Sequence, residues 1–193
     1  MIIASHITET TTRDENGRYV VNLPKKDSLT KLGDSRSQGL KRFYSLEKRL
    51  ESTPELKKEY VEFMEEYIEM GHMSKINDAY DSEVSYYIPH HPVFKPTSTS
   101  TKLRVVFDAS ARTSSGMSLN DILAVGPTIQ SDLNTILLKF RLHPYAFIAD
   151  TTKMYRQILV DLSDRHLQRV FWLSSAQEPL KYSYLWDESS LLM

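Results

Sequence analysis

Residues 145–155 read YAFIADTTKMY, an apolar run that ends in one acid, Asp150, with Tyr155 five residues further on. Five consecutive apolar or aromatic residues are typical of a strand that is buried on both faces. Asp150 comes where that strand would reach the surface, and a rigid strand end can hold a carboxylate against a hard metal ion. The alternative is an Asp that starts a turn or caps the next segment, and this stretch alone favours that alternative.

Working outward, residues 84–107 predict a β-hairpin, because two strand-like runs flank the Ser- and Thr-rich turn 95–101. Side chains alternate between the faces of a strand, so Leu103 and Arg104 should point to opposite sides. For the same reason His90 and His91 should not converge on one metal ion. A second hairpin is predicted from residues 169–173 and 180–184.

Three helical segments are indicated by apolar residues at helical spacing. A pair occupies residues 37–72, with Thr53 and Pro54 suited to start the second helix and Gly71 to end it. The glutamates opposite its apolar stripe are expected to face solvent. A third helix is predicted to open at residues 126–128 and to stop before Pro144, and Ser118 is placed to cap a short turn.

Composition and charge narrow the classes of function. The chain has 193 residues and no cysteine, which is compatible with one domain and excludes disulfides and thiolate metal sites. No signal peptide or membrane span is expected, so an intracellular protein without a membrane partner is predicted.

The charges are unevenly distributed along the chain. Residues 95–112 carry 4 bases and 1 acid (+3), and residues 139–169 carry 6 bases and 3 acids (+3). Residues 47–83 carry 5 bases and 11 acids (−6). The two basic windows suit a polyanion, although a solvated surface would also explain them.

Four blocks in this order carry a resemblance to a known family: YIPHHPVFKP at residues 87–96, KLRVVFDASA at 102–111, SLND at 118–121, and AD at 149–150 followed by KMYRQI at 153–158. They resemble the fingers and first palm motif of a reverse transcriptase, an RNA-directed DNA polymerase, of the BEL/Pao type of retrotransposon. The resemblance covers about residues 17–184.

The resemblance implies a set of roles. Asp150 would be the first catalytic carboxylate and, with the backbone carbonyl of Thr151, a ligand of Mg²⁺. Tyr155 would lie under the sugar of the incoming deoxynucleotide, and Lys95 and Arg104 would hold its triphosphate. The resemblance also makes an RNA or DNA template-primer the expected partner. The charge of the two basic windows, and not the resemblance, predicts which residues contact it: Lys95, Lys102, Arg104 and Arg112 on or near the hairpin could form one basic surface, which Lys153 and Arg156 could extend.

The sequence departs from this family in one respect that bears on activity. No Asp-Asp pair occurs in it, whereas a complete polymerase palm carries one. A truncated fragment that is inactive alone is therefore expected. A non-catalytic nucleic-acid-binding or interaction module, and an enzyme completed by another chain, are the alternatives. Self-association through the incomplete palm is a further expectation.

The predicted fold class is α+β, a partial fingers and palm with an incomplete, mainly antiparallel palm sheet. The expected divisions are a loosely ordered lead-in (1–36), the helical pair (37–72), a fingers-like hairpin and loop (73–127), a partial palm (128–185) and a divergent tail (186–193).

Overall fold

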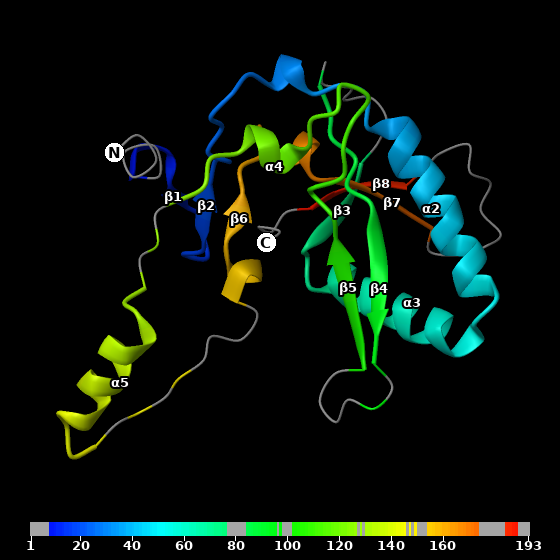
Figure 1. The fold of residues 1–193 in the computed structure, drawn as a ribbon. Coiled ribbons are helices and arrows are strands. Elements are labelled where there is room, and N and C mark those ends of the chain that lie inside the picture. Colours follow the sequence, from blue (N-terminus) through cyan, green and yellow to red (C-terminus); the bar gives the residue numbers. More distant parts are fainter. Residues whose placement is uncertain are drawn as a thin grey trace.

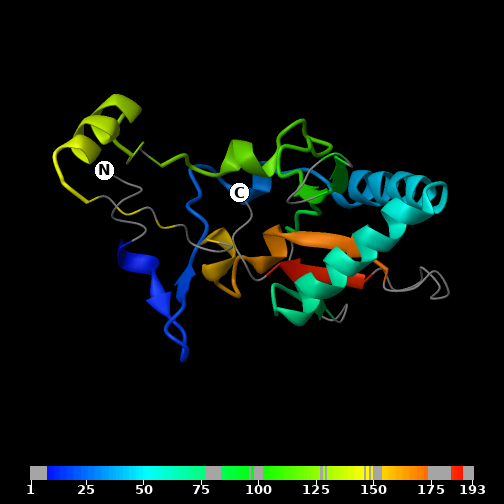
Figure 2. The same cartoon turned by 90° about the horizontal axis from the view of Figure 1, so that it is seen from below.

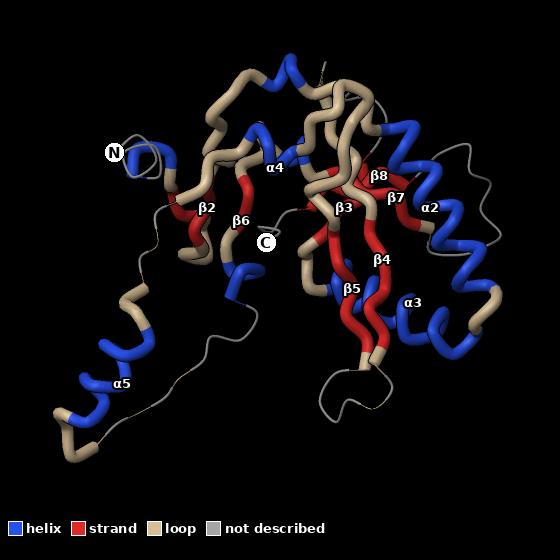
Figure 3. The backbone as a smooth tube through the Cα atoms, in the orientation of Figure 1, coloured by secondary structure: helices blue, strands red, loops and turns tan. Residues whose placement is uncertain are grey.

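The structure is a computed structural model. It describes residues 8–76, 84–95, 97, 102–126, 128, 130–145, 147, 149, 154–173 and, by backbone alone, 184–188. The fold is mixed α+β (Figures 1 and 3). Its helices are α2 (Arg36–Glu51), α3 (Pro54–Glu69), α4 (Leu119–Ile122) and α5 (Leu133–Arg141), with 3-10 turns η1 (Leu29–Lys31), η2 (Met154–Gln157) and η3 (Arg165–Leu167). Its strands are β1 (Thr12–Arg13), β2 (Tyr19–Val21), β3 (Met73–Ile76), β4 (His90–Phe94), β5 (Leu103–Phe107), β6 (Leu159–Val160), β7 (Arg169–Trp172) and β8 (Tyr184–Glu188).

The helical pair predicted from the apolar spacing is present as α2 and α3. Pro54 is the first residue of α3, and Gly71 ends the segment with a positive φ of 70°, a conformation that favours glycine. Thr53 precedes the helix but makes no capping hydrogen bond through its side chain. Tyr60 and Met64, one turn apart, are fully buried, so the stripe of α3 is core as expected.

The strands form three small sheets. β4 and β5 make the antiparallel hairpin predicted over residues 84–107. β8 lies between β3 and β7 and is antiparallel to both, and β2 lies between β1 and β6. The helices α2 and α3 run along the side of the hairpin and the β3–β8–β7 sheet, as the two views in Figures 1 and 2 show.

The core lies where these helices meet the sheets. Gly39 of α2 faces the stacked rings of Tyr87 and Phe171, whose centroids are 5.1 Å apart. A Cβ at Gly39 would come within 3.1 Å of the Tyr87 Cβ and 3.2 Å of the Phe171 ring. A small residue is needed here because the helix backbone approaches the rings so closely.

A buried imidazole joins the hairpin to this core. His90 lies between Tyr60, whose hydroxyl is 2.5 Å from its Nδ1, and Phe171, whose carbonyl oxygen is 2.8 Å from its Nε2. A carbonyl can only accept, so Nε2 carries the proton and the Tyr60 hydroxyl donates to Nδ1. Burial lowers the pKa of His90 to about 4. His91 is exposed, so the two rings face opposite sides as predicted.

The described part of the predicted lead-in is more ordered than the sequence indicated. β2 is an internal strand of its sheet, because it pairs with β1 on one side and, in parallel, with β6 on the other. Beyond it, the buried carboxylate of Asp164 accepts hydrogen bonds from the Leu23 amide (2.8 Å) and the Lys25 ammonium. Contacts across about 140 residues hold this segment, and a sequence pattern does not reveal them.

The prediction of a central strand at residues 145–150 is wrong for the described residues of that range. Tyr145, Phe147 and Ala149 are exposed and irregular, and Tyr145 and Phe147 keep 80% and 90% of their surface open. Within the described ranges no strand pairs with them, and a strand needs a partner for its backbone groups. Asp150 lies outside the described residues.

Two further boundaries are corrected. The third helix, α5, begins at Leu133 instead of residues 126–128, because Asp132 acts as its N-cap and accepts from the Thr135 amide at 3.0 Å. The second hairpin pairs β7 with Tyr184–Glu188, so that Tyr184 is the one described residue of the predicted arm 180–184, and residues 180–183 lie outside the described residues. β8 therefore crosses the boundary expected at 185–186 and is the middle strand of its sheet.

Candidate nucleic-acid interface

The β4–β5 hairpin has one covered face and one open face. Pro92 and Leu103 are buried on the inner side. On the outer side His91 is paired with Val106, and Val93 with Arg104, and all four side chains are exposed. This alternation follows from the two-residue period of a strand.

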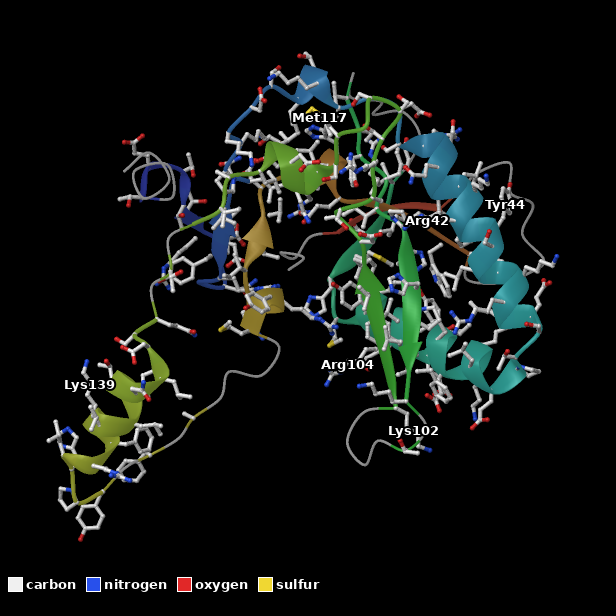
Figure 4. The ribbon with its side chains drawn as sticks, in the orientation of Figure 1. Arg42, Tyr44, Lys102, Arg104, Met117 and Lys139 are labelled. Carbon is white, nitrogen blue, oxygen red and sulfur yellow. The ribbon has the colours of Figure 1, made fainter. Side chains whose placement is uncertain are left out.

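Three cations gather at the open end of this outer face. The Lys95 amide donates to the Lys102 carbonyl oxygen at 2.8 Å, which continues the pairing of the two strands by one step. Lys95 thus lies opposite Lys102, and Arg104 is two residues further along the same face; all three side chains are exposed. Figure 4 shows Lys102 at the tip of the hairpin and Arg104 above it. We call Lys95, Lys102 and Arg104 the cationic face.

The inner side fixes the hairpin to the helices. The Tyr67 ring of α3 packs against Phe107, with 5.8 Å between centroids, and His90 is held by Tyr60 as described above. This packing fixes the backbone that carries the cationic face, so less backbone entropy is lost on binding.

The acid at the other end of the outer face is neutralised. Asp108 follows β5 and accepts from Arg42 of α2 at 2.8 Å and from the Ser110 hydroxyl at 2.5 Å. Partial burial opposes its ionisation, but these hydrogen bonds outweigh that effect and hold the pKa of Asp108 below its usual value. Its charge is therefore matched by Arg42 and does not offset the cationic face.

The other predicted site residues lie either away from the cationic face or outside the described residues. Asp150, Thr151 and Lys153 lie outside the described residues. Arg112 lies in the loop that follows β5, beyond the opposite end from Lys102, and donates to the Gly116 carbonyl oxygen at 3.2 Å. Tyr155 is about half exposed within η2.

Arg156 is engaged with the helical pair. Its guanidinium lies over the Tyr67 ring at 4.5 Å from the centroid and near Phe63 at 5.5 Å. Burial lowers its pKa, and its backbone oxygen accepts from Arg18 at 2.7 Å. These contacts place the side chain on the α3 side of the hairpin, so it is not part of the cationic face.

Sequence reasoning did not single out Arg18 or Arg42. Their partners are 138 and 66 residues away along the chain, and no local pattern marks either contact. Both arginines became recognisable only once the fold had brought the segments together.

Two other features, a metal site and a membrane span, are absent from the described residues. In this part of the chain no group of three His, Asp or Glu side chains is arranged to hold a metal ion. None of the described helices has both the length and the apolar character of a membrane span.

Comparisons with known proteins give no assignment: a scan against models of protein families and a search of curated proteins found no match. The resemblance to a reverse transcriptase therefore rests on the four sequence blocks.

Proposed function

We propose that this protein binds the sugar-phosphate backbone of nucleic acid through the cationic face, and that the β4–β5 hairpin is the fingers-like element of a reverse-transcriptase-like protein of the BEL/Pao type. The observation that carries the proposal is the gathering of Lys95, Lys102 and Arg104 on one open face, at whose far end the acid Asp108 is already paired with Arg42. Phosphate contacts by such cations give affinity without sequence preference.

The pairing of Lys95 with Lys102 strengthens this interpretation. Like charges directly opposite each other on a sheet repel, so this arrangement is unfavourable in the free protein. A bound phosphate would remove that repulsion, and Arg104 could add a two-pronged contact to the same anion. The triphosphate of a deoxynucleotide presents the same anionic phosphate oxygens as the nucleic-acid backbone. Binding that triphosphate is the role that the resemblance implies for Lys95 and Arg104.

The polymerase part of the resemblance is kept as a narrower proposal. Asp150 and Thr151 would hold Mg²⁺, which prefers oxygen ligands and would serve nucleotide transfer. The described residues offer no acid cluster that completes such a site, and we derive no catalytic step through it. Nucleic-acid binding does not depend on that site.

The binding proposal is tested by fluorescence anisotropy on a labelled RNA–DNA duplex. Replacing Lys102 and Arg104 by Ala should weaken binding at low salt by at least about fivefold, and equally for unrelated sequences. The matched control replaces Lys48 and Arg49, an exposed Lys and Arg in the last turn of α2, by Ala. Equal losses from the two double variants would show that binding is non-specific attraction to any surface base.

The expectation that the chain alone lacks polymerase activity has a separate test. Because the 193 residues contain no Asp-Asp pair, we expect no templated product in primer extension with Mg²⁺ on a primed RNA. Product that disappears in Asp150→Ala would contradict this expectation and would assign polymerase activity to the chain. The anisotropy result is independent of either outcome.

A further inference from the structure

The helix α5 has apolar side chains on its surface that the described fold does not cover. It stands apart from the three sheets in both Figure 1 and Figure 2, and none of its nine residues is buried. Helices shorter than about 12 residues are marginal alone in water, so most of the stability of such a helix must come from packing. Packing against a second surface would therefore stabilise α5.

The apolar residues are arranged as a seam. Leu133, Ile136, Leu137 and Phe140 follow the spacing i, i+3, i+4, i+7, which puts them on one face. Their exposed fractions lie between 39% and 68%. Leu138 projects from the other side of the helix. We call the four residues the α5 seam.

The charges beside the seam are complementary to those of a second copy. Asp132 and Lys139 are seven residues apart, so they flank the seam on the same side. In an antiparallel pair related by a two-fold axis, each flank meets the same flank of the partner, so Asp132 of one copy comes opposite Lys139 of the other. A parallel pair would instead bring Lys139 beside Arg141 of the second copy, which is repulsive.

We propose that the α5 seam is a homodimer interface in which two copies of α5 pack antiparallel, with Leu133 opposite Phe140 and Ile136 opposite Leu137. Each helix would bury its seam against an identical one, and the Asp132–Lys139 contacts would set the direction. The hydrogen bonds from Thr135 to Asp132 keep that carboxylate ionised, and they lower its pKa. This interface is independent of the cationic face, so it goes beyond the nucleic-acid function.

The first test compares two neighbouring leucines by sedimentation velocity over a concentration series. The wild-type protein should dimerise, and Leu137→Glu should raise the dissociation constant at least about tenfold, because a carboxylate would enter an apolar seam. Leu138→Glu makes the same chemical change one residue away, at a side chain that is more exposed (64% against 54%), and should change it less than about twofold. A wild-type monomer at all concentrations, or equal effects of the two variants, would overturn the proposal.

The second test reads the direction of packing and does not disturb the charges. The chain has no cysteine, so a single introduced thiol is unique. Ile136→Cys lies near the two-fold axis and should form a disulfide with its own copy under mild oxidation. Leu133→Cys should not, because its two copies are about 10 Å apart along the helix axis. Preferred cross-linking of Leu133→Cys would contradict the antiparallel arrangement.

Discussion

Acidification should destabilise this protein through His90. The buried imidazole is neutral in the folded state, where its pKa falls from the ordinary 6.5 to about 4. Well above pH 6.5 the His90 imidazole is neutral in both the folded and the unfolded state, so it contributes no pH dependence to the stability. As pH falls below 6.5 the unfolded chain binds a proton that the folded chain cannot, so stability decreases until the pH reaches the folded pKa. Between pH 7 and pH 5 the loss should be about 2 kcal/mol.

Urea unfolding followed by circular dichroism at the two pH values measures this loss. His90→Gln retains one donor and one acceptor but does not titrate, so its stability should fall by about 2 kcal/mol less than that of the wild type over the same interval. His91→Gln, at the neighbouring exposed position, should behave like the wild type. Other groups, including His166, whose pKa is lowered by burial, contribute equally to all three proteins. The reasoning is refuted if the wild type and His90→Gln lose the same stability.

Three further predictions concern contacts across the fold, each measured as the free energy of unfolding in urea. Tyr60→Phe leaves the buried Nδ1 of His90 without its donor and should cost about 1–3 kcal/mol, whereas Tyr44→Phe, on an exposed ring, should cost almost nothing. Asp164→Asn weakens the acceptor of the Leu23 amide and of Lys25 and should cost about 2 kcal/mol; an unchanged stability would mean that this contact does not hold the N-terminal segment. Gly33→Ala places a Cβ at 2.5 Å from the Ser115 backbone nitrogen and should cost about 1–3 kcal/mol, while Gly126→Ala meets open space and should be neutral.

The elements that the sequence predicted well are those whose signals are local. The pair α2 and α3 follows from apolar spacing, with Pro54 and Gly71 at the ends of α3. The predicted cap at Ser118 is present as a capping box with Asp121. The open and covered faces of β4–β5 follow from the period of a strand, which is why Lys102 and Arg104 could be placed on one surface in advance.

What sequence reasoning missed depends on segments far apart in the chain. The parallel pairing of β2 with β6 leaves no periodic signal in either strand, because each is only two or three residues long. Residues 145–149 have the composition of a buried strand, yet burial requires a neighbouring surface that composition does not specify. The charge of Arg156 predicts a contact with nucleic acid, whereas in the fold its guanidinium lies over the Tyr67 ring.

The central claim is that the cationic face contacts phosphates, and the salt dependence of binding tests it most directly. Each phosphate contact releases counterions, so the slope of log K against log salt counts the contacts. Removing Lys102 and Arg104 should flatten that slope by roughly two, one for each lost contact, whereas the Lys48 and Arg49 control should keep the wild-type slope. Parallel salt curves for the wild type and the Lys102→Ala, Arg104→Ala protein would contradict the account, since the cationic face would then make no phosphate contact.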